Sequence, residues 1–135
     1  MHAGTNRQIV EEVFNELSKG NGRLFLEAMA DDVRWTIKGT TAWSKTYIGK
    51  EMIRKELLAP LFAQFDGLYK NRATRIISDG DIVVVESEGS AVTKSGKPYC
   101  NTYCHVIEMM NGKFKSLTEY LDTALVEEAL KPPAG

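Results

Sequence analysis

The chain has 135 residues, of which 43% are hydrophobic, and its formal net charge is −1 from 17 basic and 18 acidic side chains. This length and composition suit one domain, residues 1–135, with a buried core. Because the basic residues are scattered and balanced by acids, we expect neither a nucleic-acid partner nor electrostatic binding to a membrane.

No apolar run approaches 18 residues, and the N-terminal segment lacks the basic-then-apolar order of a signal peptide. We therefore expect a soluble, cytoplasmic protein. Its two cysteines, Cys100 and Cys104, fall in one predicted strand about 13 Å apart, too far for a disulfide with each other. Cys104 and His105 would point to opposite faces of that strand, so we expect no metal site.

The first third of the chain predicts two helices. Thr5 and Gln8 have the spacing of a capping box, and apolar residues recur after them at helical intervals as far as Leu17. The two glycines in residues 19–22 end this helix. Residues 23–32 then predict a short second helix.

A strand and a third helix follow. Residues 33–39 alternate in polarity and contain β-branched and aromatic residues, which is typical of a strand. Residues 40–49 predict a long loop that can border a pocket. Residues 50–65 predict a helix that Pro60 kinks or divides, because proline removes a hydrogen-bond donor and clashes with the preceding turn.

From residue 69 the pattern has the period of strands, and a short helix is predicted at residues 123–130. Asn111-Gly112 is a strong signal for a hairpin. Helices followed by an antiparallel meander indicate an α+β fold, with the helices on one side of the sheet. The predicted strands are residues 69–78, 82–93, 99–110 and 113–122.

Hairpin geometry predicts which side chains share a face of the sheet. A turn at Asn111-Gly112 places His105 opposite Thr118, and a turn at Ser95-Gly96 places it opposite Glu86. One face is then polar, and it is either the outer, hydrated side or the wall of a cavity. The polar face contains Glu86, Glu88, Asn101, Tyr103, His105, Thr118, Tyr120 and Asp122. The opposite, apolar face contains Val83, Val85, Gly89, Ala91, Cys100, Cys104, Val106, Leu117 and Leu121.

The whole chain resembles the SnoaL-like polyketide cyclases and the wider superfamily of nuclear transport factor 2 and ketosteroid isomerase. The resemblance depends on "ADDV" before the first strand, "YIGKEMI" at the third helix, and "NGK" followed by "EYLD" near the end. It implies a cone-shaped, cystatin-like α+β fold, in which N-terminal helices pack on a strongly curved, mainly antiparallel sheet that encloses a pocket. It also favours the polar face as the wall of that pocket.

The resemblance implies roles for some residues and argues against others. His105 falls where the isomerase keeps a protonated aspartic acid in its oxyanion hole. The cyclases use a histidine and an aspartate, roles that His105 and Asp122 could fill. Phe14 and Ile37 fall at or near the positions of the isomerase's tyrosine donor and base, so steroid isomerisation by that route is not expected.

These features lead us to expect a small-molecule pocket protein, and no phosphate loop, dinucleotide fingerprint or zinc spacing implies a cofactor. One hypothesis is a cofactor-independent enzyme that transfers protons on a small apolar ring compound, by cyclisation, isomerisation, dehydration or epoxide hydration. The alternative is a non-catalytic ligand-binding or dimeric interaction module of the same fold. If the polar face lines the pocket, the exposed apolar face predicts a symmetric homodimer.

Candidate site residues come from the polar face and the aromatic loop. His105 can give or take a proton near neutral pH; its alternative role is a structural hydrogen bond across the sheet. Asp122 alternatively caps the last helix. The catalytic candidates are His105, Asp122, Glu88 and Tyr103. The substrate-binding candidates are Trp35, Trp43, Tyr47, Glu86, Asn101, Tyr120 and Phe14.

Overall fold

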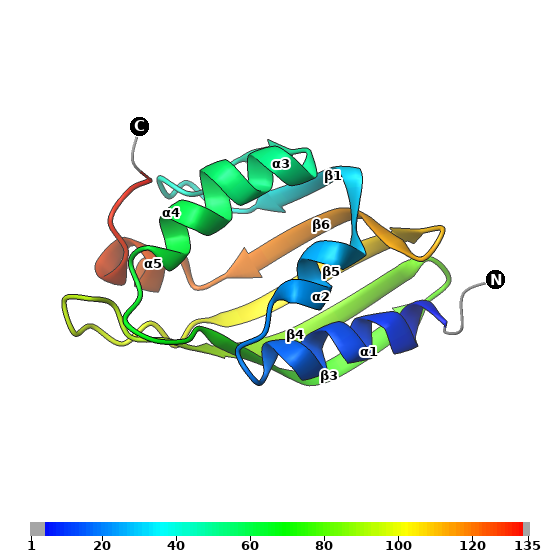
Figure 1. Cartoon of the computed structure of the whole chain (residues 1–135), viewed down its shortest axis with the longest axis horizontal. Coiled ribbons are helices and arrows are strands. Elements are labelled where there is room, and N and C mark those ends of the chain that lie inside the picture. Colours follow the sequence, from blue (N-terminus) through cyan, green and yellow to red (C-terminus); the bar gives the residue numbers. More distant parts are fainter. Residues whose placement is uncertain (1–4, 134–135) are drawn as a thin grey trace.

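The computed structural model describes residues 5–133 and contains one six-stranded sheet with helices on one side of it (Figure 1). The strands are β1 (Met29–Ile37), β2 (Thr46–Ile48), β3 (Lys70–Asp79), β4 (Ile82–Ser90), β5 (Thr102–Met110) and β6 (Lys113–Leu121). The helices are α1 (Asn6–Leu17), α2 (Arg23–Ala28), α3 (Lys50–Met52), the π-helix η1 (Ile53–Leu58), α4 (Ala59–Phe62) and α5 (Thr123–Ala129).

The strand order is β2-β1-β6-β5-β4-β3, so β2 and β3 form the two edges. Every neighbouring pair is antiparallel except β1 and β6, which are parallel. The sheet curls around α1, α2 and the α3–α4 segment, which cover its concave face (Figure 1). The expected cone-shaped α+β fold is confirmed. Within the described range, no helix has the length and apolar character to cross a bilayer.

Local signals in the sequence account for α1 and for the β5–β6 turn. Thr5 Oγ1 accepts the Gln8 N–H at 3.1 Å, and Gln8 Oε1 accepts the Thr5 N–H at 2.8 Å, which completes the predicted capping box. At the turn, Asn111 and Gly112 have φ values of 53° and 76°, as a type I′ hairpin requires.

Three elements in the first half of the chain differ from the prediction. The second helix ends at Ala28, because Met29 already pairs with β6 and begins the first strand four residues early. The expected loop at residues 40–49 contains β2, which pairs with β1. The division expected at Pro60 takes the form of the π-helical turn η1, in which the Ala59 N–H donates to Arg54 O.

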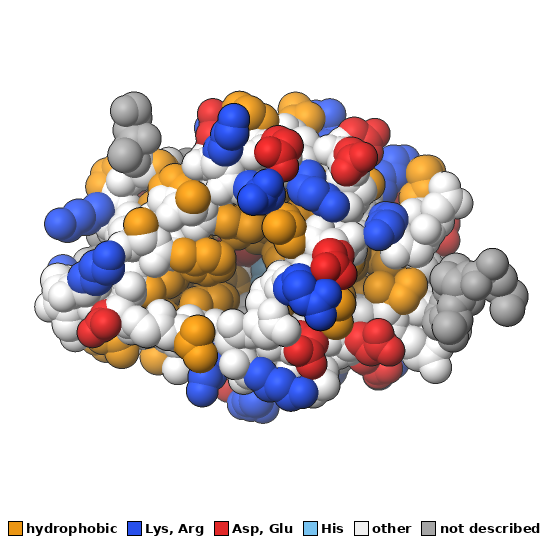
Figure 2. All heavy atoms as spheres, in the orientation of Figure 1, with side chains coloured by type: hydrophobic (Ala, Val, Ile, Leu, Met, Phe, Trp, Pro, Cys, Tyr) orange, Lys and Arg blue, Asp and Glu red, His pale blue; other side chains and the backbone are white. Residues whose placement is uncertain are grey.

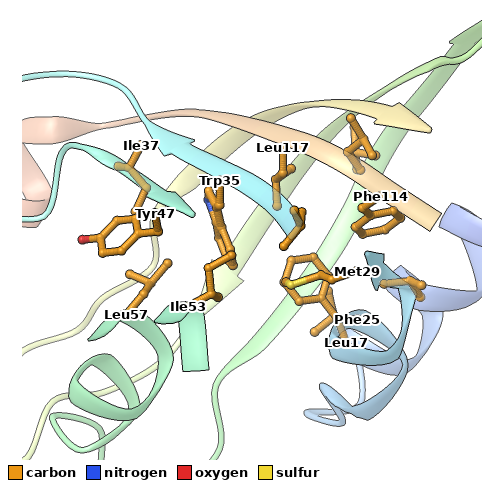
Figure 3. Packing of buried hydrophobic residues seen from close by; sticks show 14 of the residues in the cluster. Leu17, Phe25, Met29, Trp35, Ile37, Tyr47, Ile53, Leu57, Phe114 and Leu117 are labelled. Atoms are coloured by element: carbon orange, nitrogen blue, oxygen red, sulfur yellow. The ribbon is translucent and has the colours of Figure 1, made fainter. Parts of the chain in front are cut away.

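The buried core lies between the helices and the concave face. Figure 3 shows Trp35 of β1 among these side chains, with Tyr47 and Leu57 on one side of it and Phe25 on the other. The Phe25 and Trp35 rings pack edge to face with centroids 5.4 Å apart. Aromatic side chains from β1, β2 and α2 thus hold the helices against the curled sheet.

The β4–β5 register differs from the predicted one by a single residue. The chain turns through three residues, 94–96, because Thr93 and Lys97 close the loop with a 2.8 Å hydrogen bond and Gly96 has a φ of 89°. His105 is therefore paired with Val85, and Glu86 with Cys104. A shift of one residue turns each side chain to the other face of the sheet. The three-residue turn therefore places every side chain of β4 on the face opposite to the one predicted.

This shift corrects the predicted positions of two candidate carboxylates. Glu86 and Glu88 lie on the outer, convex face of the sheet, and the prediction that they share a face with His105 is wrong. Glu86 pairs with Arg75 at 2.8 Å, and Glu88 pairs with Arg72 at 2.8 Å. Both glutamate side chains are about half exposed, so these pairs contribute little to stability.

A bulge in β6 changes the second register. Met109 pairs with Phe114, but Glu108 pairs with Ser116, so Lys115 is an extra residue in β6. His105 consequently lies opposite Glu119 and not, as predicted, opposite Thr118. The same shift turns Tyr120 to the convex face, where it is 47% exposed, so its predicted place beside His105 is also wrong.

The predicted apolar convex patch is corrected as well. Val83, Val85 and Ala91 are buried in the core, because the odd loop turns them away from solvent. The convex face instead presents Val84 and Val106, both half-buried, among the ion pairs described above. The symmetric homodimer stays a prediction.

Candidate active site

A cavity of about 100 Å³ lies between the helices and the concave face of the sheet. Figure 2 shows it as a hollow lined with apolar side chains, between α4 and the α1–α2 pair of Figure 1. Its apolar wall includes Phe14, Leu17, Phe25, Trp35, Leu57 and Leu61. Its polar lining is Tyr69, Asn71, Tyr99, Tyr103, His105 and Glu119.

The centre of the site is a pair of buried titratable side chains from adjacent strands. His105 Nε2 of β5 lies 3.0 Å from Glu119 Oε1 of β6, and the two side chains are only 4% and 8% exposed. A carboxylate can only accept a hydrogen bond, so Glu119 places the imidazole proton on Nε2. In the neutral imidazole His105 Nδ1 then carries a lone pair, and this atom has no partner among the described residues. This arrangement is that of a general base oriented by a carboxylate.

Aromatic rings hold the imidazole in place. The Tyr103 ring stacks on it with centroids 5.4 Å apart and an interplanar angle of 16°, and the Phe14 ring lies 6.0 Å away. Because water is excluded from this position, the interaction between Glu119 and His105 is stronger than it would be at the surface.

Three tyrosine hydroxyls form a second polar group in the cavity wall. Burial raises the pKa of Tyr69, Tyr99 and Tyr103, so all three stay protonated at neutral pH and can donate hydrogen bonds. Gly89 makes room for Tyr69 and Tyr103, since a Cβ atom there would lie 3.0 Å from Tyr103 Cε2 and 3.1 Å from the Tyr69 hydroxyl.

Besides Glu86, Glu88 and Tyr120, three more predicted site residues do not line the cavity. Asn101 is fully buried and uses its amide to bond the Tyr99 hydroxyl at 3.0 Å and the Asp122 backbone. Tyr47 is buried, and its hydroxyl donates to Trp43 O at 2.8 Å. Asp122 Oδ1 accepts from two backbone N–H groups at the start of α5, which is the helix-cap alternative. Of the predicted site residues, those that line the cavity are Phe14, Trp35, Trp43, Tyr103 and His105.

Glu119, the carboxylate beside His105, was not among the predicted site residues. A signal for it was present in the spacing of two apolar residues. Phe114 and Leu117 are three residues apart, and both are buried on the concave face, with 0% and 1% exposure. In a regular strand they would face opposite sides, so burial of both requires a bulge between them, and the bulge directs Glu119 inward.

Comparisons with known proteins agree with this fold. The family model described as a SnoaL-like domain matches residues 10–117. An NTF2-like protein from Burkholderia thailandensis E264 has a TM-score of 0.81 at 23% identity, with 96% of this chain and 99% of that chain covered. No curated protein matches the chain in sequence.

Two further solved structures carry names that refer to enzymes. A putative SnoaL-like polyketide cyclase from Jannaschia sp. CCS1 has a TM-score of 0.75 at 18% identity, covering 96% of this chain and 93% of that one. An LEH-like epoxide hydrolase from M. tuberculosis has a TM-score of 0.70 at 19% identity, covering 91% of this chain and 86% of that one. At these identities the likeness shows a shared fold.

Proposed function

The chain belongs to the SnoaL-like domain family, and on that premise we propose that it is a cofactor-independent enzyme acting on a small, mostly apolar ring compound with a carbonyl group. The reaction is a proton transfer, of the kind that begins a cyclisation or an isomerisation. The structural likeness to a putative cyclase and an epoxide hydrolase supports a small-molecule enzyme of this fold.

The main support for the proposal is the buried His105–Glu119 pair in the wall of a mostly apolar cavity, with His105 Nδ1 unpartnered among the described residues. His105 Nδ1 takes a proton from the carbon next to the carbonyl, and the electron pair of that C–H bond moves toward the carbonyl oxygen as an enolate forms. Glu119 stabilises the imidazolium that results. The imidazolium then returns the proton, to carbon in an isomerisation or to the new alkoxide in a ring closure.

The surroundings suit this chemistry. An apolar wall removes water that would compete for the enolate, and it strengthens each electrostatic interaction within the cavity. Tyr103 acts as a positioning residue, because its ring stacks on the imidazole and limits the directions in which Nδ1 can point.

Exchange of the α-protons of 1-tetralone in D2O, followed by proton NMR, tests the proposal. The wild-type protein should accelerate the exchange over buffer, and His105→Gln should abolish the acceleration while the circular dichroism spectrum is unchanged. Glu88→Gln is the matched control, because Glu88 lies on the convex face, and it should exchange at the wild-type rate. Exchange by His105→Gln at the wild-type rate would refute the proposal. Binding of 1-tetralone without faster exchange would support the binding module instead.

A further inference from the structure

The chain has two tryptophans, and both line the cavity. Their rings are equally buried, at 6% exposure for Trp35 and 4% for Trp43. Their indole N–H groups differ, because Trp43 Nε1 donates to Lys131 O at 3.1 Å, whereas Trp35 Nε1 is buried without a partner among the described residues. The fold therefore supplies an acceptor to the Trp43 indole N–H, and none among the described residues to the Trp35 indole N–H.

An unpartnered indole N–H favours a ligand with a hydrogen-bond acceptor. An indole nitrogen can only donate a hydrogen bond, and a buried donor without an acceptor is unfavourable. The other unpartnered polar atoms of the cavity residues, Asn71 Oδ1 and His105 Nδ1, can both accept. A ligand acceptor atom next to Trp35 Nε1 would satisfy this donor.

The strand pairing places Trp35 on the same side as the base. Ile37 of β1 pairs with Glu119 of β6, which pairs in turn with His105 of β5, and Trp35 lies two residues from Ile37 on the same face. β1 and β5 are separated by one strand, roughly 10 Å between their axes. Trp35 and His105 both line the cavity, so one ligand can contact both side chains.

The charge of the cavity wall indicates which ligands fit. The cavity wall contains one carboxylate, Glu119, and no lysine or arginine among the described residues that line it. A ligand anion would be desolvated next to Glu119 with no lysine or arginine to pair with, and a protonated His105 would already pair with Glu119, so its binding is unfavourable. The cavity therefore suits an uncharged ligand.

We infer that the Trp35 indole N–H is the hydrogen-bond donor for the carbonyl oxygen of an uncharged cyclic ketone. The binding role depends only on the cavity and the unpartnered donor. A catalytic role rests on the proposed function as well: the carbonyl oxygen gains negative charge as His105 removes the α-proton, and the indole N–H stabilises that charge.

Two-dimensional ¹H–¹⁵N NMR of the full chain tests the inference with its own internal control. The two indole cross-peaks are assigned with Trp35→Phe and Trp43→Phe. Addition of 1-tetralone should move the Trp35 indole proton downfield, while the Trp43 indole proton, already bonded to Lys131 O, should move much less. Tetralin, which has the same rings without the oxygen, should bind about tenfold more weakly than 1-tetralone and should leave the Trp35 proton near its free position.

Two further measurements complete the test. The anion 1-naphthoate should bind at least tenfold more weakly than 1-tetralone. In Trp35→Phe the ratio of the affinities for 1-tetralone and tetralin should fall to nearly one. If that variant does not fold, the wild-type spectra alone test the inference. Failure of 1-tetralone to bind at millimolar concentration, equal binding of tetralin, or an unmoved Trp35 proton would each overturn the inference.

The outcomes also separate this inference from the proposed function. If His105-dependent exchange occurs but the Trp35 proton does not move, the inference is wrong and the proposed function stands. If the Trp35 proton moves but exchange is not accelerated, Trp35 binds the ketone in a protein that does not transfer the proton.

Discussion

Replacing Glu119 with glutamine removes one negative charge from the buried pair and keeps the shape of the side chain. The remaining amide oxygen can still accept the hydrogen bond from His105 Nε2, which is 3.0 Å from Oε1 in the native pair. With a neutral imidazole, folding loses only part of one hydrogen bond, about 1 kcal/mol, and gains from burying one charge less. The variant should therefore fold.

The rate should respond far more than the stability. When His105 takes a proton it becomes a cation, and the carboxylate of Glu119 stabilises it. Each charge is spread over two atoms, so the charge centres lie about 4 Å apart, and their attraction is about 4 kcal/mol at an effective dielectric constant of 20. Loss of that attraction in the transition state corresponds to a decrease of roughly a thousandfold in rate.

The assay is the exchange of the 1-tetralone α-protons in D2O, measured at saturating and at low ketone concentration. Glu119→Gln should lower the maximal rate by about a thousandfold and should change the half-saturating concentration only a few-fold, because the uncharged ketone does not contact the missing charge. Glu88→Gln controls for a change of the same chemistry on the convex face. A decrease of less than tenfold in a folded Glu119→Gln protein would refute the electrostatic argument.

Four other predictions concern the fold around the site. Gly89→Ala should lower the free energy of unfolding by about 1–3 kcal/mol, since its Cβ would lie 3.1 Å from the Tyr69 hydroxyl; urea unfolding equal to wild type would contradict this. Asp122→Ala should cost about 1 kcal/mol through loss of the α5 cap, whereas Asp122→Asn should be near neutral in stability and rate. Burial, with a smaller contribution from nearby carboxylates, raises the pKa of Tyr47 to about 12. The contribution of Tyr47 to the free energy of unfolding is therefore complete below pH 10. It falls above pH 10, by about 1.4 kcal/mol at pH 11, because Tyr47 ionises first in the unfolded chain. Urea unfolding at pH 8 and at pH 11 measures this decrease. If Tyr47→Phe loses as much stability between these two pH values as the wild type does, Tyr47 is not the cause. If the homodimer forms through the convex face, Val106→Glu should be monomeric, as measured by light scattering. A monomeric wild-type protein at micromolar concentration would show the homodimer prediction to be wrong.

Local sequence signals determine several elements of this protein. The hydrogen bonds of the α1 capping box join residues three apart, and the Asn111-Gly112 turn needs only two residues that tolerate positive φ. Such features are short in sequence, so the sequence alone specifies them. The motifs that run the length of the chain likewise indicated the cone-shaped fold and a polar strand facing its interior.

The partner of His105 was decided by tertiary structure. A three-residue turn at residues 94–96 and one extra residue at Lys115 moved Glu86 to the outer face and brought Glu119 inside. Side chains alternate along a strand, so a change of one residue in a loop or bulge exchanges the two faces completely. The loop length and the position of the bulge depend on burying Phe114 and Leu117 together beneath the helices. That requirement exists only once the sheet and the helices have packed.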